Sequence, residues 1–354
     1  MKKGIIFVPF MTGKGGTETV IHNLFKAFAN DDQFSLKVYS IGGSDDYGWT
    51  EGVNVKSQSI SKHRTIRTLY YATLLPTKIH QVIAKEQPDF VISTNPIMWY
   101  LAKKSLLFMK KSTPVIAWYH YSLSQKPIKQ FLLKSADFFL AISTGIKRQL
   151  MDLGINEHKI FLVYNPIDSN YAIIPRPSDG THFIYLGRVN LDGQKNVREL
   201  IDGLSGVKGR WLLDIYGDDK KADPVKKYIA EKGIENHVNW KGFVNDPWNS
   251  ITSATSLVLT SKYEGLPMVL CEAISHGIFC VSSDIETGPS DIINNYNGKL
   301  YPSGDIKQLT SILQNIVDEP QKLPKQSTII STSNKFSLLN YHKYFHQALD
   351  LITE

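Results

Sequence analysis

The feature that most limits the fold of this chain is a repeated alternation of short apolar segments and helical segments. In the first part of the chain, strands are expected at 4–10, 36–41, 89–93, 114–118, 138–142 and 160–164, with helices at 18–29 and 66–84, the second broken near Pro76. Strand–helix alternation favours a parallel sheet covered by helices on both faces. The sequence therefore predicts a doubly wound α/β domain over residues 1–166.

The same alternation restarts after an irregular stretch. Pro166 restricts the backbone of Asn165, and residues 167–180 have little regular pattern. Beyond it, strands are expected at 183–186, 211–216, 238–240, 256–260 and 279–282, and helices at 197–204, 224–232, 267–275 and 335–352. We therefore expect a second doubly wound domain over residues 167–335. Ligands bind at the carboxyl ends of the strands in such sheets, so two facing domains predict one cleft between them.

Length and cysteine content agree with this interpretation. A chain of 354 residues is long for one core and suits two domains. It has no run of about 18 apolar residues that could span a membrane. Cys271 and Cys280 are the only cysteines and form no disulfide framework, which favours a cytoplasmic protein with reduced thiols.

Positive charge is concentrated in the first half of the chain. Residues 1–168 carry 21 Lys and Arg against 12 Asp and Glu, a net charge of +9, whereas the remaining residues have a net charge of −2. The densest part holds Lys103, Lys104, Lys110, Lys111, Lys126, Lys129, Lys134, Lys147 and Arg148. The first four lie in pairs seven residues apart, which predicts one basic helix face. Such a face is attracted to anionic lipid headgroups or to nucleic acid, and a merely solvated face is the simpler alternative.

Two glutamates eight residues apart are the strongest indication of a site. Glu264 follows a strand, and Glu272 lies within the next helix, for which Pro267 is the expected first residue. The backbone amides of Met268 and Val269 then lie at the helix N-terminus, where anions bind. Carboxylates accept hydrogen bonds from hydroxyls and free amides donate to phosphate, so the segment suits a nucleotide sugar. The alternative is that both glutamates are ordinary charges near a helix start.

A glycine-rich turn follows the first strand. It reads Gly13-Lys14-Gly15-Gly16-Thr17-Glu18, and its glycines let the backbone approach a ligand closely. It is not a dinucleotide fingerprint, because Glu18 stands where the last glycine is required, and it lacks the Lys-Ser or Lys-Thr pair of a P-loop. A plain tight turn is the alternative.

Cations and a histidine follow two other predicted strands. Arg188 comes after the strand 183–186, and Lys195 lies seven residues further on. This pair suits a diphosphate, because Arg binds phosphate in a bidentate manner and Lys binds it as a point charge. His120 follows the strand 114–118, although a lone histidine among aromatic residues is more often structural. The sequence contains no D-x-D triplet, H-E-x-x-H motif or cysteine cluster, so no metal is expected.

Taken together, these residues resemble a known family. Gly15-Gly16, His120, Gly187-Arg188, Lys195 and Glu264-x7-Glu272 occur in the order and spacing of the retaining glycosyltransferases of family four. Shorter motifs, among them Asp192-Gly193-Gln194-Lys195 and Gly288-Pro289-Ser290-Asp291, look like those of bacterial lipopolysaccharide 1,6-galactosyltransferases. The resemblance implies the glycosyltransferase B fold: two Rossmann-like domains that face each other across a cleft, with a final helix, residues 336–354, that crosses back to the first domain.

The resemblance also implies a role for each candidate residue. His120, Arg188, Lys195 and Glu264 would form the catalytic set, with His120 near the reacting face of the sugar. Arg188 and Lys195 would bind the diphosphate of the donor, and the amides of Met268 and Val269 would cap its distal phosphate. Glu272 would bind the ribose, Glu264 the sugar, and the backbone of Phe243 the base. Leu266 and Pro267 would complete the donor-binding loop. Gly15 and Gly16 would lie beside the phosphates, and Glu18 would contact the acceptor.

The function implied by the resemblance is transfer of a hexose, with galactose as the first choice, from a UDP-sugar to a lipid-linked or surface glycan such as lipopolysaccharide core. The anomeric configuration would be retained, without metal or other cofactor. A sugar-nucleotide epimerase of the same fold and a non-catalytic basic protein that binds membrane or nucleic acid are the alternatives. We expect a cytoplasmic enzyme attached to the inner face of the membrane through its basic first domain, with no nucleic-acid partner.

Overall fold

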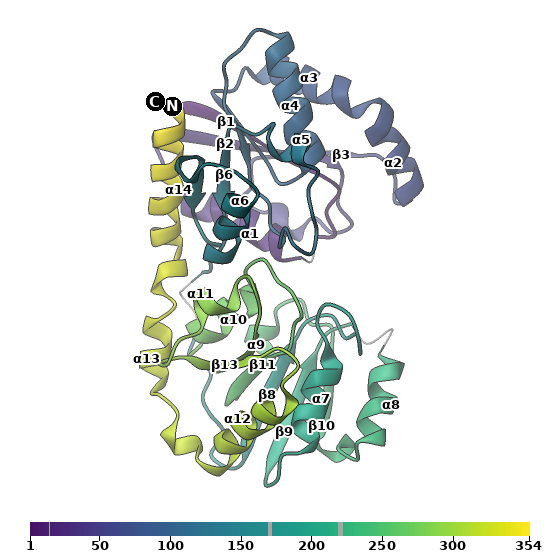
Figure 1. Ribbon diagram of the computed structural model, residues 1–354, viewed down its shortest axis with the longest axis vertical. Coiled ribbons are helices and arrows are strands. Elements are labelled where there is room, and N and C mark those ends of the chain that lie inside the picture. Colours follow the sequence, from purple (N-terminus) through teal and green to yellow (C-terminus); the bar gives the residue numbers. More distant parts are fainter. Residues whose placement is uncertain (14, 169–171, 219–221) are drawn as a thin grey trace. The chain divides into compact units, whose positions relative to one another are not determined.

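The computed structural model describes residues 1–13, 15–168, 172–218 and 222–354, and forms two compact units (Figure 1). The first unit combines Met1–Asp168 with Phe336–Glu354, and the second is Ser169–Lys335. Each unit is organised around one parallel sheet with helices in the connections. The predicted pair of doubly wound α/β domains is thereby confirmed.

The first unit contains a seven-stranded sheet in the order β3-β2-β1-β4-β5-β6-β7. Its strands are β1 (Lys2–Val8), β2 (Phe34–Gly42), β3 (Val55–Ser59), β4 (Phe90–Ser93), β5 (Val115–Ala117), β6 (Phe138–Ala141) and β7 (Ile160–Leu162). Ile5, Ile6 and Phe7 of β1 are at most 2% exposed, as expected for an apolar strand with helices on both faces. The strand order reverses between β1 and β4, which is where ligands of such sheets bind.

The helices of the first unit lie in the strand connections, and one comes from the end of the chain. They are α1 (Gly16–Ala27), α2 (Arg64–Thr73), α3 (Leu75–Glu86), α4 (Pro96–Phe108), α5 (Gln130–Leu133), α6 (Thr144–Asp152) and α14 (Leu338–Thr353), with the 3-10 turns η1 (Gly48–Thr50), η2 (Glu157–Lys159) and η5 (Asn334–Phe336). The Phe345 ring of α14 lies 5.6 Å from that of Phe28 and 5.7 Å from that of Trp118. Lys2 Nζ donates to the Thr353 carbonyl at 3.0 Å, so the two termini lie side by side (Figure 1).

The second unit contains a six-stranded sheet in the order β10-β9-β8-β11-β12-β13. Its strands are β8 (Thr181–Leu186), β9 (Trp211–Tyr216), β10 (Val238–Gly242), β11 (Ser256–Leu259), β12 (Phe279–Asp284) and β13 (Gly298–Pro302). Its helices are α7 (Val197–Ser205), α8 (Asp223–Glu231), α9 (Pro247–Ser250), α10 (Met268–Ser275), α11 (Pro289–Ile292), α12 (Ile306–Asp318) and α13 (Gln326–Ser331), with the 3-10 turns η3 (Glu235–His237) and η4 (Pro320–Lys322). The order reverses between β8 and β11, so the loops after these two strands meet at one edge.

Several expectations about single elements need correction. Strands β3 and β13 were not predicted, because edge strands such as Val55–Ser59 carry few apolar residues. The expected face of Lys103, Lys104, Lys110 and Lys111 is wrong: α4 ends at Phe108, and Lys110 has a φ of 53°, which no α-helix continues through. The break expected near Pro76 occurs at Leu74, between α2 and α3. Pro76 itself lies in the first turn of α3.

Within the described ranges, no helix is both long enough and apolar enough to cross a membrane.

Candidate functional site

Three of the predicted residues meet at the switch point of the second sheet. Arg188 and Lys195 lie in the loop after β8, and Glu264 lies in the loop after β11. Lys195 Nζ donates to Glu264 Oε1 at 2.7 Å, and only 14% and 11% of these side chains are exposed. The low exposure strengthens the Coulomb attraction within this ion pair, because screening by solvent is reduced, while the desolvation of both charges opposes that gain.

Gln194 joins the cation of one loop to the carboxylate of the other. Its Nε2 donates to the Tyr263 carbonyl at 3.0 Å and to Glu264 Oε2 at 3.3 Å, while its Oε1 accepts a hydrogen bond from Arg188 Nη2. The sequence assigned no role to Gln194, although it directly precedes Lys195. Its position next to Lys195 could have marked Gln194 as a candidate site residue. The local sequence, however, does not show that its side chain connects two loops.

Backbone contacts hold both loops in register. Lys262 N donates to the Gln194 carbonyl at 2.8 Å, and the Thr260 hydroxyl donates to the Lys195 and Asn196 carbonyls at 3.2 and 2.9 Å. The Tyr185 hydroxyl donates to the Arg188 carbonyl at 2.8 Å. Tyr185 lies in β8, and Thr260 and Lys262 follow β11 closely, so these contacts fix the loops next to the ends of their strands.

A third loop, after β12, contacts the backbone of the Glu264 loop. The Thr287 hydroxyl donates to the Glu264 carbonyl. Gly288 has a φ of 100°, and a Cβ there would lie 2.6 Å from Pro267 Cδ and 2.9 Å from the Gly265 carbonyl oxygen. Both the backbone conformation and the close approach therefore require glycine at this position.

The start of α10 differs slightly from the prediction. The helix begins at Met268, and Pro267 occupies the N-cap position, because its ψ of 99° is extended rather than helical. Within the described chain no side chain caps this end. The first-turn amides, including those of Met268 and Val269, have no partner within the helix, which makes this end suitable for an anion. Leu266 is 5% exposed, so it can face a ligand only through its backbone.

Glu272 lies further along α10, beside an aromatic pair. The Trp248 Nε1 donates to Glu272 Oε2 at 3.0 Å, and the Trp248 and His276 rings stack with their centres 4.9 Å apart. Burial raises the pKa of the half-buried Glu272 carboxyl, and the Trp248 hydrogen bond opposes this shift. Phe243, predicted to meet the base, directly follows β10 and is 49% exposed. Trp248 had no predicted role.

In the first unit, Glu18 faces its own loop. Its Oε1 accepts hydrogen bonds from Thr12 N at 3.0 Å, from the Thr12 hydroxyl at 3.0 Å and from Gly13 N at 2.9 Å, and the residue is 6% exposed. A Cβ on Gly15 would lie 2.6 Å from Glu18 Oε2. Glu18 thus shapes the glycine-rich loop that continues into α1 at Gly16, and its predicted contact with an acceptor remains untested. Lys14 of this motif lies outside the described residues.

His120 follows β5 and is held in a neutral form. Burial lowers the pKa of its ring to about 3, and its ring centre lies 4.6 Å from that of Trp118. Its Nε2 is buried and has no hydrogen-bond partner among the described residues. An unpaired buried nitrogen is costly unless a ligand or water supplies the partner, so the ring is suited to meet a polar group.

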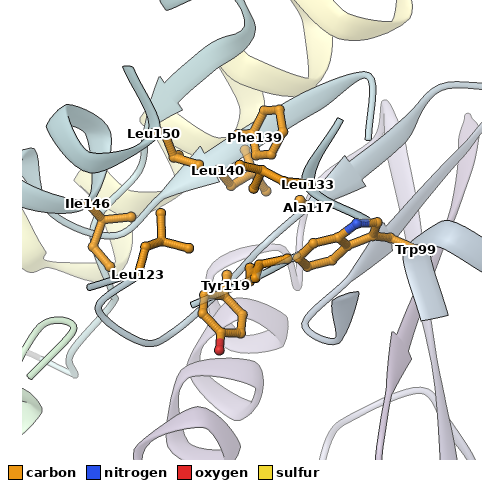
Figure 2. A pocket seen from close by; sticks show the side chains of 10 residues that line it. Trp99, Ala117, Tyr119, Leu123, Leu133, Phe139, Leu140, Ile146 and Leu150 are labelled. Carbon is orange, nitrogen blue, oxygen red and sulfur yellow. The ribbon is translucent and has the colours of Figure 1, made fainter. Parts of the chain in front are cut away.

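An apolar cavity lies beside the same stretch of chain. Figure 2 shows its lining, which includes Trp99, Ala117, Tyr119, Leu123 and Phe139. None of the predicted site residues lines it. Its lining is almost entirely apolar, which indicates incomplete packing of the core rather than a site for a charged ligand.

In the described part of the chain, the arrangement of His, Cys, Asp and Glu side chains bears on metal binding and on thiol chemistry. There, no group of three or more His, Cys, Asp or Glu side chains is arranged to hold a metal ion. Cys271 and Cys280 are both buried, and burial raises the pKa of each thiol. Neither thiol is thus activated as a nucleophile.

Comparisons with known proteins identify the family of this chain. Residues 14–171 match the family "Glycosyltransferase Family 4", and residues 167–334 match "Glycosyl transferases group 1". The "Lipopolysaccharide 1,6-galactosyltransferase" of Escherichia coli (strain K12) is 33% identical over 354 residues, which are 96% of this chain and 95% of the relative. The protein of the same description from Salmonella typhimurium is 34% identical over 350 residues, which are 96% of each chain.

Solved structures show the same likeness. The "lipopolysaccharide outer core galactosyltransferase WaaB apo form" has a TM-score of 0.85 and 33% identity, over 98% of this chain and 99% of its own. Anabaena Alr3699/HepE "in complex with UDP" has a TM-score of 0.81 over 99% and 100% of the two chains, but at 18% identity it shows a common fold alone. Two family matches that together span nearly the whole chain, and relatives of this identity and coverage, show that this protein belongs to the family 4 glycosyltransferases of the B fold.

Proposed function

We propose that this transferase moves a hexose, with galactose as the first choice, from a UDP-sugar to a hydroxyl of lipopolysaccharide core or a similar lipid-linked glycan. The observation that carries the proposal is the linked set Arg188, Gln194, Lys195 and Glu264 at the switch point of the second sheet. The descriptions of the relatives from Escherichia coli and Salmonella typhimurium support the sugar and the acceptor. UDP is the proposed nucleotide because the resemblance of the site residues to the family implies it.

The proposed donor contacts follow from the chemistry of each group. Arg188 and Lys195 neutralise the diphosphate, and the amides of Met268 and Val269 donate to its distal phosphate. Glu272 accepts hydrogen bonds from the ribose hydroxyls, as Trp248 Nε1 engages only one of its oxygens. With two cations and a helix end on the leaving group, the transferase is proposed to need no metal.

The proposed reaction retains the anomeric configuration. The bond from the anomeric carbon to the diphosphate oxygen breaks, the acceptor oxygen bonds to the same face of that carbon, and its proton passes to the leaving diphosphate. Both oxygens of Glu264 already accept hydrogen bonds, from Lys195 and Gln194, which favours a role in orienting sugar hydroxyls over attack on the anomeric carbon. The neutral His120 ring suits a hydrogen bond to the sugar.

The proposed location is the cytoplasmic face of the membrane, and nucleic acid is not a proposed partner. The basic first half of the chain supports this location, because anionic headgroups attract clustered Lys and Arg.

The decisive test is transfer by the purified chain from UDP-galactose or UDP-glucose to lipopolysaccharide that lacks outer-core side chains. We expect product in the presence of EDTA, with a retained configuration by NMR. Arg188→Ala and Glu272→Ala should abolish transfer, whereas Arg210→Ala and Glu231→Ala, which change exposed side chains of the same unit, should not. Interconversion of UDP-galactose and UDP-glucose without acceptor would instead identify an epimerase, and a covalent sugar adduct on the protein would exclude the proposed route.

A further inference from the structure

We infer that helix α2, residues Arg64–Thr73, is the surface by which the first unit docks on an anionic lipid bilayer. The inference rests on the proposed function, in which the acceptor glycan is attached to a membrane lipid, and refines it by assigning the membrane contact to one helix. Figure 1 draws α2 at the margin of the first unit.

Helix α2 carries an apolar stripe that is at least half exposed. The structure describes all ten of its residues, and none is buried. Ile66 is 50% exposed, Leu69 is 64% exposed, and Leu74, which ends the helix, is 54% exposed. Ile66 and Leu69 are three residues apart and therefore share one side of the helix. Apolar helix residues at this spacing normally face a core, whereas here they face water.

Contacts on another side of α2 hold this stripe outward. The Arg67 guanidinium lies 3.7 Å from the centre of the Phe10 ring, and the same side chain donates to the Ser61 and Lys62 carbonyls at 2.8 Å. The Tyr71 hydroxyl donates to the Ile41 carbonyl at 2.6 Å and accepts from Phe10 N at 3.0 Å. The helix is thus fixed by polar and aromatic contacts that leave Ile66 and Leu69 in solvent.

The charge around α2 matches an anionic surface. Residues 52–85 contain no Asp or Glu, and they include Lys62, Arg64, Arg67 and Lys78. Lys62 and Arg64, at the start of the helix, are exposed. An exposed apolar stripe with flanking cations is the composition of a helix that lies in the headgroup region, with its apolar side in the acyl chains and its cations on the phosphates.

The position of α2 also suits a lipid-linked acceptor. The helix is seated on Phe10 and Ile41, which lie at the carboxyl ends of β1 and β2. The glycine-rich loop of Gly13 and Glu18 follows the same end of β1. Docking through α2 therefore brings the bilayer to the sheet edge that carries the candidate groups of this unit.

A second basic and apolar surface, around α4 and α5, is less well suited. It includes Lys103, Lys104 and Phe131, but Lys103 is paired with Asp137 at 2.6 Å. The most exposed apolar residue there is Phe108, at 82%. It ends α4, which starts directly after β4 and runs back to the amino edge of the sheet. Docking there would leave the glycine-rich loop on the side away from the membrane.

The test is co-sedimentation of the full chain with vesicles of phosphatidylglycerol and phosphatidylcholine in equal parts, and with phosphatidylcholine alone. Wild-type protein should bind only the anionic vesicles. The pair Lys62→Gln and Arg64→Gln should weaken binding about 30-fold, because each cation contributes roughly 1 kcal/mol at such a surface. The pair Ile66→Ser and Leu69→Ser should weaken it at least about tenfold through the loss of apolar burial in the acyl region.

The matched control is the pair Leu107→Ser and Phe108→Ser, which removes exposed apolar residues from α4 and should leave vesicle binding unchanged. All variants should keep the wild-type melting temperature, because the replaced side chains lie largely in solvent. The assignment is overturned if wild-type protein ignores anionic vesicles, if the α2 variants bind normally, or if the control loses binding. A change from dimer to monomer on Ile66→Ser and Leu69→Ser would identify the stripe as a contact between copies and would also overturn it.

Two further measurements separate this inference from the proposed function. Transfer to a delipidated, water-soluble acceptor fragment, and the thermal shift with UDP, should be unchanged in the α2 variants. If these variants bind vesicles normally while wild-type transfer is intact, only the docking inference fails. If wild-type protein transfers no sugar from UDP-hexoses, the proposed function fails whatever the vesicles show.

Discussion

The glycine-rich loop after β1 and the loops after β8 and β11 all lie at the switch points of their sheets, but they use their glutamates differently. Glu18 accepts hydrogen bonds from Thr12 and Gly13, which belong to its own loop. Glu264 accepts from Lys195 and Gln194, which come from another loop. A glutamate at the switch point therefore stabilises its own loop in the first unit and joins charged groups from two loops in the second.

The net charge of each half does not indicate where the cations of the candidate site lie. The first 168 residues have a net charge of +9 and the rest a net charge of −2, yet the cations predicted to bind a diphosphate, Arg188 and Lys195, lie in the acidic half. The excess cations of the basic half include exposed residues such as Lys62 and Arg64. Net charge thus describes the average character of a whole surface, whereas a binding site depends on a few groups in fixed geometry.

The largest effect should come from the ion pair of the second unit. Lys195→Met removes the proposed phosphate contact and leaves the Glu264 carboxylate without its cation, so kcat/KM should fall about 1000-fold, or about 4 kcal/mol. Steady-state transfer from the UDP-sugar measures this, with Lys227→Met at an exposed site as the control. Activity within tenfold of wild type would mean that the pair only supports the loop, as Glu18 does.

Exchange of the two glutamates for neutral residues should separate their roles. Glu18→Ala removes the carboxylate that accepts from the partly exposed amides of Thr12 and Gly13 and should lower the free energy of unfolding by about 1 to 2 kcal/mol, measured in urea. Glu18→Gln, which keeps an acceptor, should restore most of this stability. Glu264→Gln should impair transfer and change the unfolding free energy less than Glu18→Ala. If the Glu18 and Glu264 variants changed transfer and unfolding free energy by equal amounts, the two glutamates would not have different roles.

Gln194→Ala should have an intermediate effect. It frees the Arg188 guanidinium and one Glu264 oxygen, and the loss of these positioning contacts should lower kcat/KM about tenfold, or about 1.4 kcal/mol. The readout that separates positioning from folding is UDP affinity by calorimetry, which should fall while the melting temperature stays unchanged. A variant that unfolds at lower temperature and binds UDP normally would assign Gln194 to stability alone.

The smallest expected effect concerns His120 in the first unit. Folding lowers the pKa of this ring to about 3, so the unfolded chain binds the proton more tightly and stability decreases as the pH falls below the ordinary histidine value. Between pH 6.5 and 5.5 the wild type should lose about 1 kcal/mol more than His120→Asn. Urea unfolding at both pH values measures the difference. Identical pH slopes in the two proteins would show that the ring is not held neutral by burial.

Much of the site could be predicted because its residues follow predicted strands directly. Arg188 follows β8, Glu264 follows β11, and His120 follows β5, so the carboxyl edge could be assigned from the strand pattern alone. Gln194 and Trp248 could not be assigned, because their importance lies in contacts with Glu264 and Glu272, 70 and 24 residues away. The lysine face was predicted wrongly because the end of α4 at Phe108 depends on the left-handed backbone of Lys110.

The sequence by itself determined two parallel α/β domains and the chemical groups at their strand ends, because strand and helix periodicity are local properties of the chain. Only the tertiary structure decided the direction of each side chain. It turned Glu18 onto its own loop, joined Lys195 to Glu264 across 69 residues, and left the stripe of α2 in solvent. The reason is physical: burial and hydrogen-bond partners depend on segments that are distant in sequence, and no periodic pattern records which of them meet.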